Sequence, residues 1–242
     1  MRPAAVAAQV RAELTMTLRR GESVLLSLGI PVLLLVFFSA VDVLPTDRRH
    51  PVDFLAPGIL ALAVMSTAMV GLGIATGFER QYGVLKRLGT TPLGRPALLA
   101  AKTVAVLGVE MVQVVVLVVV AALLGWQPSG AVGLAVVAML LATVAFAGLG
   151  LLMAGTLRAE MVLAAANGLY LVLLLLGGMV VPLTKLPAGM RAVARALPAA
   201  ALSDALHGAF DAAARVPTRS WVVLAAWAIL APLAAAATFR WE

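Results

Sequence analysis

The sequence predicts an all-α membrane protein with six transmembrane helices. Hydrophobic residues make up 63% of the 242 positions and charged residues only 12%, a composition far more apolar than that of an average soluble domain. A membrane span needs about 20 apolar residues, and the chain contains several apolar runs of that length separated by short charged stretches. One membrane domain over residues 1–242 therefore accounts for the whole length.

The first 22 residues are predicted to form an amphipathic helix that lies in the membrane interface. Apolar residues recur in this stretch at fourfold spacing, and arginines lie between them. The apolar positions are Val6, Val10, Leu14 and Leu18, and the arginines are Arg2, Arg11, Arg19 and Arg20. A frayed basic N-terminus is the alternative interpretation of the same residues.

The next apolar run, Val24 to Val43, is interpreted as an uncleaved first span because it is long enough to cross the bilayer. Pro31 inside it should kink the helix, which membrane helices tolerate where a neighbour satisfies the freed carbonyl. Further spans are predicted over residues 54–78, 97–125, 131–157, 161–181 and 221–239.

Three residues of these spans carry predictions about packing. Gly73 and Gly77 make a small-xxx-small face on the second span, which allows a neighbouring helix to approach closely. Lys102, near the start of the third span, is placed to extend its side chain toward the interface.

The segment 182–220 differs from the spans, because prolines interrupt it and apolar and charged residues are mixed. It predicts two short helices at one face of the membrane. Six spans place both termini on one side, and that side, with the 79–96 loop, carries more Lys and Arg than the side with 182–220. The positive-inside rule therefore predicts cytoplasmic termini for a multi-pass protein of the cytoplasmic membrane.

One charged stretch, residues 78–93, separates the second and third predicted spans. Wound as a helix, it has one apolar and one charged side. The apolar side holds Phe78, Tyr82, Leu85 and Leu88, and the charged side holds Glu79, Arg80, Lys86 and Arg87. Gly89 is placed to cap this helix and Pro92 prevents its continuation. We expect a short amphipathic helix at the membrane surface by which a partner moves the membrane part.

Composition argues against several other classes of function. The formal net charge is +7, but the positively charged residues lie between apolar runs and do not form a continuous basic patch. Nucleic-acid binding is therefore not expected. The chain has no cysteine, and its two histidines, His50 and His207, lie far apart in the sequence. Disulfides, thiolate metal sites and a histidine metal centre are therefore not expected.

Polar residues in or near the apolar runs leave two interpretations open. Glu110, Gln113 and Asn167 either pair with neighbouring helices or line a translocation path, where Glu110 would help to select cationic substrates. An intramembrane enzyme or a channel would use Glu110, Asn167, Asp42 and His207. Hydrolysis requires a nucleophile beside a base or a metal, and neither histidine has such companions within a span. No catalytic residue is therefore predicted.

Two motifs resemble those of ABC-2 type transporter permeases. The first is the run ERQYGVLKRL at residues 79–88, which closes with Thr91-Pro92-Leu93, and the second is GGMVVP at residues 177–182, followed by Leu186-Pro187, Leu197-Pro198 and Asp204-Ala205-Leu206. Their order and spacing, with the six spans and the N-terminal helix, extend the resemblance over essentially the whole chain. The sequence departs from the commoner pattern at Gln81, Val84 and Lys86, where Glu, Thr and Glu are frequent. This basic variant is closer to the drug-exporter branch.

The resemblance implies that residues 79–93 form a coupling helix received by the cleft of a cytoplasmic ATP-binding subunit. The coupling residues that it implies are Glu79, Arg80, Tyr82, Gly83, Leu85, Lys86, Arg87, Leu88, Thr91 and Pro92. It also implies that two permease copies, or two related permeases, pair in the membrane and export an amphipathic drug, lipid or glycan. The chain contains no G-x-x-x-x-G-K-[ST] loop, so no cofactor is expected in it, and ATP and Mg²⁺ would be bound by the partner ATPase.

Overall fold

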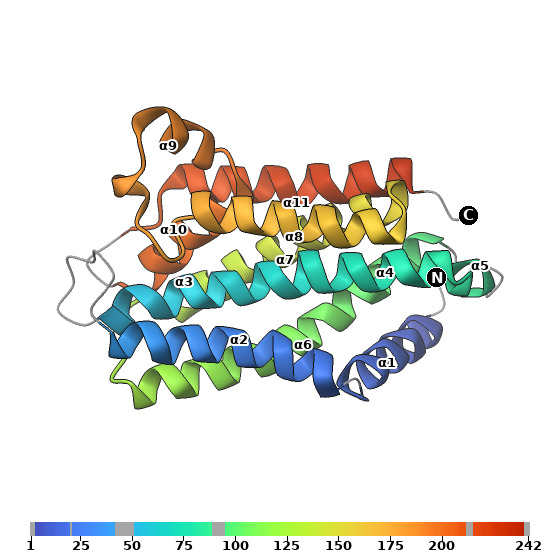
Figure 1. Cartoon of the computed structure of the whole chain (residues 1–242), viewed down its shortest axis with the longest axis horizontal. Helices are drawn as coiled ribbons and strands as arrows, with labels where there is room; N and C mark the ends of the chain where they lie inside the picture. Colours follow the sequence, from blue (N-terminus) through green and yellow to red (C-terminus); the bar gives the residue numbers. More distant parts are fainter. Residues whose placement is uncertain (1–2, 20, 42–50, 89–94, 212–214, 240–242) are drawn as a thin grey trace.

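The computed structural model describes residues 3–19, 21–41, 51–88, 95–211 and 215–239, and within these ranges every regular element is a helix (Figure 1). The predicted all-α class is therefore confirmed. In chain order the elements are α1 (Pro3–Arg19), α2 (Gly21–Ala40), α3 (Pro51–Met65), the π-helical turn η1 (Ser66–Gly71), α4 (Leu72–Gln81), α5 (Val84–Leu88), α6 (Arg95–Leu123), α7 (Val132–Thr156), α8 (Ala159–Leu176), the 3-10 turn η2 (Leu183–Lys185), α9 (Ala188–Ala194), α10 (Pro198–Phe210) and α11 (Thr218–Thr238).

Five helical segments are long and apolar enough to cross a membrane, and they correspond to the second to sixth predicted spans. These segments are Pro51–Gln81, Ala97–Leu123, Val132–Thr156, Ala159–Leu176 and Thr218–Thr238. The predicted first span forms α2, but the apolar part of it that the structure describes, Ser27–Ala40, is shorter than a span. The count of six therefore stays a prediction.

Three spans differ at their ends from the predicted bounds by three residues or more, and one of them, the sixth, begins at Thr218 instead of Trp221. The second span is longer at both ends, because α3, η1 and α4 join into one helical run from Pro51 to Gln81. The fifth ends at Leu176 instead of continuing to residue 181. Gly178 adopts a φ of +67° just beyond this end, and a left-handed glycine is a common way to terminate a helix.

Small residues allow α7 to approach α4 closely. A Cβ added to Gly73 of α4 would lie 3.1 Å from the carbonyl oxygen of Gly150 in α7, so the two backbones meet almost directly. Gly77, one turn further along α4, faces the side chain of Val162 in α8. The close packing predicted for Gly73 and Gly77 is confirmed, and it holds α4 firmly against α7 and α8.

The helix α1 packs along α6 at the end of the bundle where α5 lies (Figure 1). A Cβ added to Gly108 of α6 would lie 2.6 Å from Cδ2 of Leu14, so Leu14 rests on the glycine surface of α6. The predicted N-terminal helix is confirmed as a helix, and its location in the membrane interface stays a prediction.

Two helices, α9 and α10, form within 182–220 as predicted, and their position at a membrane face stays a prediction. The small apolar side chains of α10 are almost all buried, and it packs against α3, α7 and α11. Pro198 begins the helix, a position where proline is compatible with helical geometry. The abundance of alanine explains this burial, because a helix with such small side chains fits between larger helices.

Candidate functional site

The charged stretch after the second span folds as two helices joined by a sharp turn, rather than as the single amphipathic helix that was predicted. The first helix, α4, ends at Gln81, and α5 begins at Val84. Between them Gly83 adopts a φ of +70°, a conformation that costs side-chain-bearing residues about 1–2 kcal/mol. Gly83 therefore permits the change of direction that makes α5 a separate element at one end of the bundle (Figure 1).

The turn separates the predicted apolar face, and this corrects the expectation that Tyr82 and Leu85 share one docking surface. Tyr82 is 72% exposed and stacks on Phe78, whereas Leu85 is 0% exposed. Leu85 packs with Leu98 of α6 and with Phe239, which follows α11. Leu85 is thus an anchor within the chain, and it is not presented to a partner.

The outer surface of α5 is formed by other members of the predicted coupling set. Lys86 and Arg87 are exposed beside Tyr82. Leu88 is the last residue of α5, but its side chain lies outside the described part of the chain, as do Thr91, Pro92 and the predicted cap Gly89. The accessible surface of α5 and of the turn before it therefore presents Tyr82, Val84 and two basic side chains.

The side chains at the end of α4 point toward the chain's own helices, although the helical pattern placed Glu79 and Arg80 on the outer, charged side. Nη2 of Arg80 donates a hydrogen bond to the carbonyl oxygen of Leu157. Nε2 of Gln81 donates to Oε1 of Glu160 over 2.8 Å. The two bonds connect the last turn of α4 to the end of α7 and to the first turn of α8.

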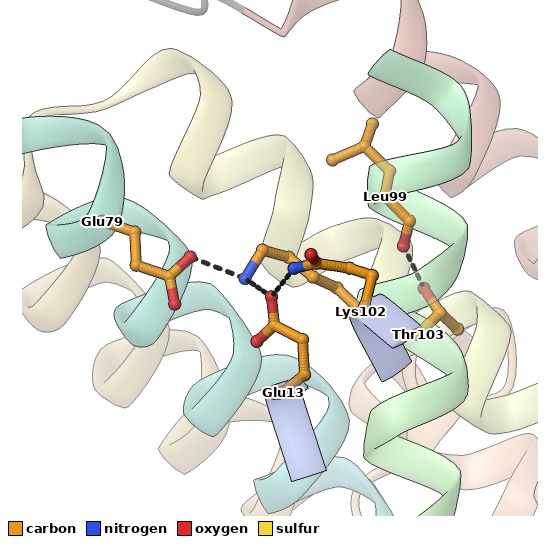
Figure 2. A network of polar contacts seen from close by, with 6 residues as sticks. Glu13, Glu79, Leu99, Lys102 and Thr103 are labelled. Carbon is orange, nitrogen blue, oxygen red and sulfur yellow. Dashed lines mark hydrogen bonds and ion pairs between the residues drawn. The ribbon is translucent and has the colours of Figure 1, made fainter. Parts of the chain in front are cut away.

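Glu79 connects the same turn of α4 to two other helices through a buried lysine (Figure 2). Nζ of Lys102 in α6 lies 2.6 Å from Oε2 of Glu79 and 2.8 Å from Oε1 of Glu13 in α1. Nε2 of Gln9 also donates to Oε1 of Glu13, over 2.9 Å. The Lys102 side chain is 1% exposed, so the prediction that it extends toward the interface is wrong.

The side chain of Gln113, a residue predicted to line the translocation path, forms hydrogen bonds to other helices inside the bundle. The residue is 2% exposed. Its Oε1 accepts a hydrogen bond from the Thr67 hydroxyl in η1 over 2.8 Å, and its Nε2 donates to the carbonyl oxygen of Ser27 in α2 over 2.9 Å. This geometry favours the structural interpretation, in which Gln113 joins α2, η1 and α6.

Of the other two predicted path residues, Glu110 is buried and Asn167 is exposed. Glu110 is 5% exposed, and its Oε2 accepts a hydrogen bond from the Thr143 hydroxyl of α7 over 2.6 Å, which again favours interhelical pairing. Asn167 is exposed on α8, where its Nδ2 donates to the carbonyl oxygen of Leu163. The structure does not bring the three predicted path residues together.

A polar cavity lies at the end of the bundle opposite α5. It is lined by residues in or next to α3, α10 and the α6–α7 connection, among them Asp53, Trp126, His207 and Asp211. The predicted path residues do not line it. Within the described ranges, no group of three or more His, Asp and Glu side chains is arranged to hold a metal ion.

Comparison with known families identifies what kind of protein carries this site. The model of the ABC-2 type transporter family matches residues 5–210, a range that includes α10 and the whole α4–α5 region. The chain belongs to the ABC-2 type transporter family. No curated protein sequence matches it.

This ABC-2 permease is accordingly the membrane subunit of an ABC-type transporter, in a family whose members work with an ABC ATP-binding subunit. Its five apolar helices agree with a multi-pass membrane location. At the end of the bundle with α5, this exposed element follows α4, and its Leu85 packs with Leu98 of α6 and with Phe239 after α11.

Sequence reasoning missed the role of Glu13 at this end of the ABC-2 permease. A signal was present, because Glu13 is the single acidic residue among the basic and apolar residues 1–20. An acidic side chain on a basic amphipathic helix, together with a lysine inside an apolar run, predicts a buried pair more directly than it predicts two solvated charges.

Proposed function

We propose that this chain is the permease subunit of an ATP-driven exporter in the cytoplasmic membrane. A separate ATP-binding subunit contacts α5 and hydrolyses ATP, and the permease moves an amphipathic drug, lipid or glycan. Two copies of the chain, or this chain and a related permease, pair to enclose the path. Movement of α5 alternates the packing of the spans between inward-facing and outward-facing arrangements.

The observation that carries this proposal is the attachment of α5 to the bundle. The outer surface of α5 and of the turn that precedes it presents Tyr82, Lys86 and Arg87. The inner side of α5 is held by Leu85 against Leu98 and by the side chains of the adjoining turn of α4. A force applied to α5 therefore reaches α6 through Leu85, and reaches α1, α7 and α8 through the last turn of α4, as a coupling element requires.

Exposure of the last spans supports pairing with a second permease. The apolar windows of α8 and α11 are only 22% and 17% buried within the chain, so most of their surface meets lipid or another protein. Asn167 lies on the exposed surface of α8. Because an amide facing lipid is costly, we place Asn167 at the contact with the second permease or on the path between the two.

Capture of the ATP-binding subunit tests the proposal. A membrane preparation of the tagged permease, co-expressed with an ABC ATP-binding subunit from the same organism, should retain that subunit through purification. The double variant Lys86→Glu/Arg87→Glu reverses the charge of the exposed α5 surface and should lower the captured amount at least about tenfold, which corresponds to ~1.4 kcal/mol.

Lys185→Glu is the matched control, because it reverses an exposed lysine in η2, at the end of the bundle remote from α5. It should leave the captured amount unchanged. Equal capture by the wild type and the α5 variant, with both chains folded, contradicts the assignment of α5 as the contact. Absence of any captured ATP-binding subunit with the wild type contradicts the proposed function.

A further inference from the structure

The ion pairs at Lys102 join helices that pack in different parts of the bundle. The helix α1 lies along α6, whereas α4 lies against α7 and α8. Lys102 of α6 contacts Glu13 of α1 over 2.8 Å and Glu79 of α4 over 2.6 Å. As Figure 2 shows, the three side chains meet from three separate helices, with the lysine between the two carboxylates.

The location of Glu79 gives this contact mechanical importance. Glu79 lies two residues before the end of α4, four residues before the Gly83 turn and five before α5 begins. Any displacement of α5 that rotates the last turn of α4 would draw Glu79 with it. Because Lys102 also holds Glu13, that displacement is transmitted to the N-terminal helix.

Burial makes the contact resistant to separation. The side chains of Lys102, Glu13 and Glu79 are 1%, 11% and 19% exposed. Two carboxylates share one ammonium, so moving either carboxylate away leaves it without its counter-ion in a poorly solvated place, which is strongly unfavourable. Helices held this way are expected to move together rather than to slide past one another.

We infer that Lys102 is a positioning residue that fixes the last turn of α4, and with it α5, relative to α1. When α5 moves, α1 moves with it as one unit. The two helices move about α6, which contains Lys102. This inference rests on the proposed function, since it concerns how movement of the coupling element reaches a helix that α5 does not itself bind.

Distance measurements between spin labels test the inference directly. The chain has no native cysteine, so pairs of introduced cysteines give a single labelled pair each. Ala12→Cys and Val84→Cys place labels at exposed positions of α1 and α5, and double electron–electron resonance reports the distance between them. Neither residue belongs to the ion-pair network.

The charge-removing variant is Glu13→Gln/Glu79→Gln/Lys102→Met. Removing Lys102 alone leaves two buried carboxylates and risks unfolding, whereas neutral residues of similar shape at all three positions remove the ion pairs and leave no unpaired charge. A melting temperature close to that of the wild type shows that the triple variant is folded.

The matched reference pair is Val84→Cys with Thr156→Cys, at an exposed position at the end of α7. The last turn of α4 reaches this region through Arg80 and Gln81, and Lys102 is not involved. In the triple variant the α5–α7 distance distribution should keep its wild-type width.

In the purified complex with the ATP-binding subunit, the wild-type α1–α5 distance should stay constant when ATP and vanadate are added. In the triple variant it should broaden, and ATP with vanadate should shift it by more than the width of the wild-type distribution. An unchanged α1–α5 distribution in the triple variant, with and without nucleotide, overturns the inference. Failure of the proposed function is distinguishable, because the wild-type chain would then capture no ATP-binding subunit before any variant is measured.

Discussion

The side-chain amide of Gln113 in α6 donates a hydrogen bond to the backbone carbonyl of Ser27 in α2 over 2.9 Å. Pro31 follows Ser27 by four residues and has no backbone N–H, so α2 itself cannot supply the usual bond to this carbonyl. A polar side chain of a neighbouring helix thus compensates for a proline within α2, as was predicted for Pro31.

The pairing of Gln113 with Pro31 predicts a coupled effect on stability. Gln113→Leu should lower the free energy of unfolding by about 0.6–2 kcal/mol, because the Ser27 carbonyl loses its donor and the Thr67 hydroxyl its acceptor. In a Pro31→Ala background, Ala at position 31 restores the helical N–H, so the same substitution should cost less. Thermal unfolding of the four proteins of this double-mutant cycle measures the difference. An equal penalty in both backgrounds would show that Gln113 acts independently of the proline.

The burial of Leu85 leads to a second prediction. Leu85→Ala should destabilise the permease by about 2–5 kcal/mol, because it opens a cavity beside Leu98 and Phe239. Val84→Ala, at a neighbouring residue that is 39% exposed, is the control and should change stability by less than about 0.5 kcal/mol. Fluorescence-detected thermal unfolding in detergent measures both. If Leu85→Ala melts at the wild-type temperature, Leu85 is not a buried anchor, and the prediction that it belongs to the docking surface stands again.

In the 78–93 stretch, one part of the sequence prediction was correct and another was wrong, which shows where sequence reasoning was sufficient. Amphipathic spacing correctly predicted helix in this stretch, though not its break, and the apolar runs located most of the spans, because both depend on local periodicity. The spacing could not reveal the left-handed turn at Gly83, since glycine also occurs in unbroken helices. The inward direction of Leu85 and Glu79 depends on Leu98, Phe239 and Lys102, and no local pattern predicts which distant residues will pack there.

A close approach of α3 to the loop after α8 leads to a third prediction. A Cβ added to Gly58 would lie 1.9 Å from the carbonyl oxygen of Met179 and 2.8 Å from its carbonyl carbon. Both atoms belong to the backbone, so Gly58→Ala forces α3 and this loop apart and should cost about 1–3 kcal/mol. Gly133→Ala in α7 is the matched control, because no atom lies within 4 Å of its added Cβ.

The two glycine substitutions should act in opposite directions. Alanine at position 133 reduces the conformational freedom of the unfolded chain and should raise stability by up to about 1 kcal/mol. The melting temperatures of the two variants, measured under the same conditions, check this. Similar shifts in both variants would mean that the helix propensity of alanine, rather than contact with Met179, determines the result.

The last prediction concerns Asp204 in α10, outside the membrane-spanning segments. Burial raises the pKa of this carboxyl above its usual range, and the charges of Arg195 and Arg219 offset only part of the shift. A carboxyl whose pKa is higher in the folded than in the unfolded state binds its proton more tightly when folded. Its contribution to stability is therefore fully present below the unfolded pKa of about 4 and is lost as the pH rises through the folded pKa.

Asp204→Asn keeps the shape of the side chain and removes its titration. The variant should therefore be more stable than the wild type at neutral pH, and the difference should shrink as the pH falls toward about 4. Thermal unfolding of both proteins across this pH range in the same detergent measures the difference. A variant that is less stable than the wild type at neutral pH would mean that the ionised carboxylate of Asp204 gains more from Arg195 and Arg219 than it loses through burial.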